Sequence, residues 1–277
     1  MSPLRCGLVA LTAIAGLAAF SLSALVVTAR ASFLMNQGAA QVAAPGRLAT
    51  LSVFLATGPQ LPIPYRARRR LEAVNRRFDK EASLEVTTEF DPDRGFSYAV
   101  LEEAGSSLVR NRVLRAALET EAKTIASGAT QSALTPENYF IADAGEDERG
   151  LVRLRLQPRR KDQLLVDGFV LVTPGNAEVV RIEGRLAKNP SFWITRVEIV
   201  RRYESVLGFN VPVEVSSEAQ MRIFGPSSFR MRYRYESIHG IAVPASAPRA
   251  DVPPLARALR VSRPPEEASA TEPDDPF

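Results

Sequence analysis

The chain contains one cysteine and one histidine among its 277 residues. Cys6 lies near the N-terminus, so the residues after it cannot form a disulfide with one another. His239 has no G-x-S-x-G or comparable serine motif to act with, and the sequence therefore offers no nucleophile and base for hydrolysis. Zinc and copper sites need several histidine or cysteine ligands, which this composition excludes. We expect no catalytic residue, no metal and no cofactor, and a fold held by its packed core alone.

Signatures of nucleotide and nucleic-acid binding are missing as well. No G-x-x-x-x-G-K-[ST] or G-x-G-x-x-G motif is present to hold a phosphate. The 35 basic and 31 acidic residues give a net charge of +4, and the arginines alternate with glutamates instead of clustering. This pattern is typical of a solvated surface with mixed charges, and it argues against a nucleic-acid partner.

The N-terminus has the pattern of a targeting segment. Arg5 precedes an uncharged apolar run, residues 7–29, and Ala29-Arg30-Ala31 offers small residues at the two positions that a signal peptidase reads. The same run would extend about 35 Å as a helix, enough to span a bilayer. We predict that residues 1–31 are a signal peptide cleaved near Ala31, with an uncleaved anchor that tethers the chain to the inner membrane as the alternative. Both predictions export the remainder, which points to the periplasm.

Glycine and proline mark the segments on either side of the central region. Residues 32–64 contain several of each and are predicted to be mainly a linker, in which the apolar Leu51–Ala56 could form an edge strand or a membrane-associated patch. Residues 242–277 contain eight prolines, which favours a disordered tail.

Residues 65–241 form one domain with a mainly β pattern. Arg66, Arg68 and Arg70 alternate with apolar positions, and the next segment alternates in the same way around Glu85 and Glu89. Further alternating segments of up to a dozen residues follow as far as Ile241, and such lengths suit a sheet that wraps. We predict a mainly β (α+β) fold, in which a curved antiparallel sheet forms an incomplete β-barrel.

One long helix interrupts this pattern at about residues 106–128. Val109, Val113, Leu114, Leu118 and Ile125 recur at helical spacing and form one apolar stripe. Ser106 or Ser107 can cap its start and Gly128 can end it. The stripe should pack on the sheet, so we expect the helix to cover an apolar hollow.

Several segments in order resemble bacterial outer-membrane lipoprotein-sorting proteins, the LolA/LolB-like superfamily, and in particular its uncharacterised exported members. They are Ser132–Tyr139, Gln157–Asp162, Asp167-Gly168, Ile182–Gly184 and Asn189–Trp193, and the resemblance covers about residues 65–241. It implies a half-barrel whose concave face, covered by helices, holds acyl chains. The partners that it implies are a lipid or lipoprotein acyl chain and a protein of the inner or outer membrane.

Eleven side chains are candidates to line the cavity if the strand registers hold. They are Phe96, Tyr98, Val113, Leu114, Leu118, Phe169, Trp193, Val197, Ile199, Phe229 and Tyr233. In an open cavity they would bind the hydrophobic ligand of a non-enzymatic carrier. In a filled core the same fold would be an envelope protein-interaction or sensing module. Sequence alone leaves both open, because a slip of one residue reverses every face of a strand.

Overall fold

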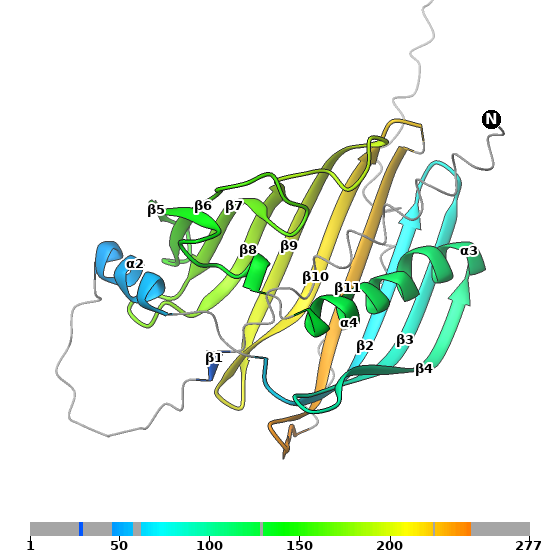
Figure 1. The fold of residues 1–277 in the computed structure, drawn as a ribbon, viewed down its shortest axis with the longest axis horizontal. Helices are drawn as coiled ribbons and strands as arrows, with labels where there is room; N and C mark the ends of the chain where they lie inside the picture. The colour runs from blue at the N-terminus through cyan, green and yellow to red at the C-terminus, as the bar shows by residue number, and fades with distance from the viewer. Residues whose placement is uncertain (1–27, 30–45, 58–61, 128–129, 224, 245–277) are drawn as a thin grey trace, which may run out of the picture.

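The structure, a computed structural model, describes residues 28–29, 46–57, 62–127, 130–223 and 225–244. Ten antiparallel strands form one path in the order β4-β3-β2-β11-β10-β9-β8-β7-β6-β5, and the sheet is not closed (Figure 1). This confirms the predicted fold class, a curved antiparallel sheet that forms an incomplete barrel with one long helix. The strands are β2 Tyr65–Asn75, β3 Lys80–Asp91, β4 Gly95–Gly105, β5 Tyr139–Glu146, β6 Val152–Pro158, β7 Val166–Val172, β8 Val179–Leu186, β9 Ile194–Val206, β10 Phe209–Met221 and β11 Gly225–Ile238. Two short strands, β1 Thr28–Ala29 and β12 Ile241–Ala242, pair with β10 and β11.

Alternating side chains give the sheet an inner apolar face and an outer charged face. In β2 the odd-numbered residues from 65 to 73 are buried and Arg66, Arg68 and Arg70 are exposed. The predicted pairing with β3 is confirmed, because Arg66 lies opposite Glu89 and Arg70 lies opposite Glu85. Such cross-strand pairs of opposite charge contribute about 0.2–1 kcal/mol each, so the outer face supports the register that the inner face requires.

The predicted helix at about 106–128 forms as three successive pieces. These are α3 Ser107–Val109, the π-helix η1 Arg110–Arg115 and α4 Ala116–Ala126. Together they run across β2, β3 and β4 on the inner face (Figure 1). A π-helix adds a residue to a turn and is found mainly as a short interruption of α-helices. Here it divides the cover into a short start and a longer second part.

A second helix forms where the sequence suggested a linker with an edge strand. Helix α2, Arg47–Ala56, packs against β5 and β6, so Leu51–Ala56 is helical. Thr50 and Phe54 lie four residues apart, on one face of the helix, and both are buried. The physical reason for the difference is that this apolar run has no period-two alternation, which a half-buried strand would need.

Two apolar clusters make up the core. The larger one lies between the long helix and strands β2, β3, β9, β10 and β11, and it includes Leu71, Leu84, Leu114 and Met231. The smaller one lies beneath α2 and includes Phe54, Leu154 and Val170. The inner face of the sheet is therefore covered by two helices: α2 lies over β5 and β6, and the long helix lies over β2, β3 and β4.

The predicted leader and tail lie almost wholly outside the described residues. Of residues 1–31 only Thr28–Ala29 are described, and of residues 242–277 only 242–244. Within the part of the chain that the structure describes, no helix has both the length and the apolar character needed to cross a membrane. The limits proposed for the leader and tail stay predictions.

Candidate functional site

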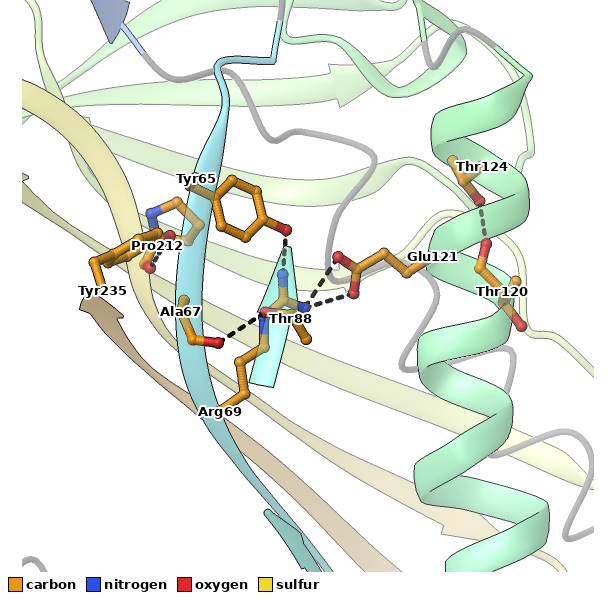
Figure 2. Close-up of polar contacts among 9 residues, drawn as sticks. All are labelled: Tyr65, Ala67, Arg69, Thr88, Thr120, Glu121, Thr124, Pro212 and Tyr235. Atoms are coloured by element: carbon orange, nitrogen blue, oxygen red, sulfur yellow. Dashed lines mark hydrogen bonds and ion pairs between the residues drawn. The ribbon is translucent and has the colours of Figure 1, made fainter. Parts of the chain in front are cut away.

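A buried ion pair joins the covering helix to the sheet. Arg69 on β2 donates from Nη1 to both carboxylate oxygens of Glu121 on α4, at 3.0 and 2.7 Å. Its other terminal nitrogen, Nη2, donates to the hydroxyl of Tyr65 (Figure 2). The Arg69 side chain has no exposed surface and that of Glu121 is 1% exposed. Two opposite charges are thus held in contact inside the core, where neither can be solvated by water.

Aromatic rings surround the Arg69 guanidinium. Its central carbon lies 4.5 Å from the ring centroid of Tyr233, 5.3 Å from that of Phe96 and 5.6 Å from that of Tyr65. A ring face carries partial negative charge and attracts a cation, more strongly where water is excluded. Tyr235 stacks on Tyr233 and donates its hydroxyl to the Pro212 carbonyl at 3.0 Å. Three aromatic rings therefore stabilise the positive charge of Arg69 through cation–π contacts.

Burial changes the proton affinity of this cluster. Loss of water around Glu121 raises its pKa from 4.5 to about 7, and the attraction of Arg69 opposes the rise. Burial also raises the pKa values of Tyr65 and Tyr233 above their usual value of 10, so both phenols keep their protons at neutral pH. Glu121 is the group in this cluster whose charge changes near neutrality.

The start of the helix is attached at the exposed edge of the sheet. Glu103 on β4 forms ion pairs with Arg110, at 3.4 Å, and with Arg115, both of them in η1. Arg110 also donates to the Gly105 carbonyl at 2.6 Å. The helix thus has one polar attachment at its π-helical segment and a second, buried one at Glu121 on α4.

The structure brings most of the predicted lining residues together. Seven are buried in the larger apolar cluster: Val113, Leu114, Leu118, Val197, Ile199, Phe229 and Tyr233. Three others, Phe96, Tyr98 and Trp193, are partly buried and pack against it. Their contact with a ligand stays a prediction, since the described side chains pack on one another here.

Phe169 lies on the outer face, away from the other ten. It is opposite Glu183 in the β7–β8 pairing, and the Arg153 guanidinium carbon lies 3.6 Å from its ring centroid. The register is set by Gly168 and Gly184, which face each other so closely that a Cβ on Gly168 would lie 2.0 Å from the Glu183 carbonyl oxygen. With these glycines on the inner face, Phe169 must point outward.

The expected hollow beneath the helix is filled by side chains among the described residues. Leu71, Leu84, Leu114 and Leu118 have no exposed surface. A separate small cavity, about 10 Å³, has room for about one water molecule. It is lined by Ser132, Leu134, Tyr139, Leu164, Val166, Ile182 and Arg201. Among the described residues the space beneath the helix is thus a filled core, which is one of the two alternatives that the sequence left open.

Sequence reasoning missed the ion pair, although a signal was present. Arg69 falls in the apolar phase of β2, between Ala67 and Leu71. Glu121 follows Leu114 and Leu118 at helical spacing on the buried stripe. A basic and an acidic residue that each occupy a core position of neighbouring elements predict a buried pair.

The described residues contain no group of three or more histidine, cysteine, aspartate or glutamate side chains that could hold a metal ion. His239 is exposed at the end of β11, with its ring centroid 6.2 Å from that of Phe209. Two basic pairs differ in exposure: Arg159 and Arg160 are both exposed, whereas Arg201 is buried and Arg202 is exposed.

Two solved structures share a distant likeness with the chain. A LolA superfamily protein from Nitrosomonas europaea is 11% identical, with a TM-score of 0.37, over 69% of this chain and 92% of that chain. A DUF1329 family protein from Desulfovibrio piger is 11% identical, with a TM-score of 0.32, over 68% of this chain and 89% of that chain. No family model matches the chain, and no curated protein matches it. Likeness at this level assigns neither a family nor a function, so the function is inferred from the residues of this chain.

Proposed function

We propose that this protein is a non-enzymatic binder of a hydrophobic chain, a lipid or a lipoprotein acyl group, in the bacterial periplasm. The ligand would lie on the inner face of the sheet, in the space that α4 occupies in the closed state. The observation that carries the proposal is an extended apolar sheet face covered by a helix whose second part is tied to it by the buried pair Arg69–Glu121. A buried ion pair contributes little net stability but favours one arrangement over others, which suits a cover that closes in one position.

The energetics allow the exchange of helix for ligand. Leaving the sheet would expose the apolar side chains of α4, at a cost of about 1.5–3 kcal/mol for a residue such as Leu118. A bound acyl chain gains about 0.8 kcal/mol for each buried CH₂ group, so about fourteen carbons contribute roughly 10 kcal/mol. The ligand can therefore compensate for the helix contacts that it replaces.

The two attachments suggest how the helix opens. In the open state the ion pairs of Glu103 with Arg110 and Arg115 would keep η1 on β4, and α4 begins directly after Arg115. Breaking the contact of Glu121 with Arg69 then frees α4 while the helix stays joined to β4. Because the closed helix raises the pKa of Glu121 to about 7, the loss of this proton as pH rises weakens the second attachment.

A thiol-accessibility experiment tests the opening directly. In a Cys6→Ser background, Leu118→Cys places the sole thiol at a position with no exposed surface. We expect slow modification by a maleimide in the ligand-free protein and acceleration of at least tenfold by a fatty acid. Lys123→Cys, on the exposed side of α4, is the matched control and should react at the same rate with and without ligand.

Lipid recovery gives a second and independent test. The full chain, purified without detergent, should yield an acyl lipid to mass spectrometry after solvent extraction, or take up a fluorescent fatty acid. Recovery of no lipid, together with no uptake and an unchanged rate at Leu118→Cys, would refute the proposal.

The filled interior favours a second candidate function. A packed core beneath the helix is what a protein-interaction or sensing module of the same fold would have. Its partner would pair with the exposed edge strand β4, where Val100 and Leu101 are 37% and 50% exposed, or bind residues 242–277. Deleting residues 244–277 separates the alternatives: a carrier keeps its lipid binding, while a module that depends on the tail loses its partner in a pull-down assay.

A further inference from the structure

Three connections lie side by side at one end of the sheet. They join β2 to β3 (residues 76–79), β8 to β9 (187–193) and β10 to β11 (222–223 in the described chain), and the strands that carry them are neighbours. The Arg222 amide donates to the Trp193 carbonyl at 2.9 Å, and the Arg76 amide donates to the Pro226 carbonyl at 3.4 Å. We call these residues, 76–79, 187–193 and 222–223, the hairpin rim; they form the upper edge of the sheet in Figure 1.

Each connection of the hairpin rim presents a large apolar side chain to solvent. Phe192 is 74% exposed, Phe78 is 49% exposed and Ile223 is 43% exposed. Single exposed apolar residues are common on proteins, but one on each of three adjacent connections is a local concentration. Phe78 precedes Phe192 and Ile223 by more than a hundred residues, so the fold itself brings the three side chains to one edge.

Positive charge accompanies these apolar tips. The hairpin rim contains Arg76, Arg77, Lys188 and Arg222, and one acidic residue, Asp79. The ion pairs found among the described residues involve none of these four basic side chains, all of which are exposed. The Arg222 guanidinium carbon lies 4.7 Å from the ring centroid of Phe192, so charge and aromatic surface form one feature.

The opposite end of the sheet has the opposite charge. The β3–β4 turn holds Asp91 and Asp93 with Arg94, and the β5–β6 connection holds Asp147 and Glu148 with Arg149, so each carries a net negative charge. Each of these is at the far end of its strands from the hairpin rim, because antiparallel strands alternate their connections between two ends. Because positive and negative charges lie at opposite ends of the sheet, a negatively charged surface would orient the protein with the hairpin rim facing that surface.

We propose that the hairpin rim docks onto the surface of an anionic phospholipid bilayer. Arginine and lysine would contact lipid phosphates, while Phe78, Phe192 and Ile223 enter the interface between headgroups and acyl chains. The basic side chains favour an anionic membrane over a neutral one. The exposed apolar side chains favour a membrane over a partner that is bound by charge alone. The inference goes beyond the proposed binding of a hydrophobic chain and does not depend on it, since it involves a different surface.

Vesicle sedimentation with the full chain tests the docking. Vesicles of phosphatidylcholine containing phosphatidylglycerol should bind the protein at least tenfold more tightly than vesicles of phosphatidylcholine alone, and 0.5 M NaCl should weaken this binding. Arg77→Gln combined with Arg222→Gln should lower the partition coefficient about 25-fold, since each charge near the surface contributes about fivefold. Phe78→Ser combined with Phe192→Ser should lower it at least tenfold.

Matched controls lie elsewhere on the molecule. Leu48→Ser removes an apolar side chain that is 71% exposed on α2, and Arg94→Gln removes a charge at the opposite end of the sheet. Both should bind anionic vesicles as the wild type does. Equal binding of the wild type to the two kinds of vesicle would overturn the proposal, and so would wild-type binding by both rim double variants. A concentration-dependent self-association that Arg77→Gln and Arg222→Gln abolish, without vesicle binding, would instead identify the acidic end of a second copy as the occupant and overturn it too.

Discussion

Replacing Glu121 with leucine should be among the most damaging single changes in the covering helix. The substitution leaves the Arg69 guanidinium buried beneath α4 without its counter-charge, since the pair is 2.7 Å apart and neither side chain reaches solvent. Removal of one partner from a buried ion pair costs about 3–5 kcal/mol, because the remaining charge is neither hydrated nor neutralised. We expect Glu121→Leu to lower the free energy of unfolding by this amount, and Arg69→Met to lower it similarly.

The double variant should recover most of that loss. With both charges replaced by apolar side chains of similar volume, the desolvation penalty disappears together with the attraction, and stability should return to within about 1 kcal/mol of the wild type. The singles and the double form a thermodynamic cycle whose coupling free energy should be several kcal/mol, far from additive.

Urea unfolding followed by circular dichroism at pH 8, where Glu121 is mainly ionised, measures all four proteins. Glu119→Leu, at an exposed position of α4, is the control and should change stability by less than about 0.5 kcal/mol. If Glu121→Leu cost less than about 1 kcal/mol, or if the two single losses simply added, the claim that a buried ion pair joins helix and sheet would be wrong.

Three further predictions concern pH, close backbone contact and packing. Because the pKa of Glu121 is raised in the folded protein, its protonated carboxyl adds stability that is fully present below pH 4.5 and is lost as pH rises through about 7. The free energy of unfolding of the wild type relative to that of Glu121→Gln should therefore fall between pH 4.5 and 8 in urea titrations. Gly168→Ala should cost about 2 kcal/mol or more, because its Cβ would meet a backbone oxygen at 2.0 Å, whereas Gly46→Ala meets nothing within 4 Å and should cost less than about 1 kcal/mol by the same assay. Leu114→Ala should cost about 2–5 kcal/mol in thermal or urea unfolding, against less than about 0.5 kcal/mol for the 46% exposed Leu108→Ala.

The sheet and its cover were predictable because their signals are local. Charges alternate with apolar residues in β2 and β3, and Thr173–Asn176 supplies a turn between two apolar runs, so the pairings of β2 with β3 and of β7 with β8 follow from short stretches of sequence. The covering helix has an apolar stripe at helical spacing and was likewise placed correctly, although its N-cap Ser106 makes no side-chain capping hydrogen bond. The spacing of apolar residues, every second position in a strand and about every 3.6 positions in a helix, can be read from a short stretch of sequence without the rest of the chain.

What the sequence did not disclose depends on contacts between distant segments. Phe169 precedes Val170, Leu171 and Val172, and such a continuous apolar run does not say which face is buried. The choice came from the close approach of Gly168 to Gly184, which requires both strands to be in place. Helix α2 depends in the same way on its contacts with β5 and β6, which no local pattern in residues 32–64 indicates.

The buried pair also bears on the choice between a carrier and a module with a filled core. A permanent core gains nothing from Arg69 and Glu121, because apolar residues of the same volume would be at least as stable. An opening cover does gain, since its two charges can be hydrated when α4 leaves the sheet and apolar replacements cannot. The pair therefore lowers the cost of the open state relative to an all-apolar interface, and its effect should be seen in the opening rate as well as in stability. Replacing both charges by Met and Leu should slow maleimide modification of Leu118→Cys even where the free energy of unfolding is unchanged, and equal rates in the two backgrounds would favour the permanently filled module.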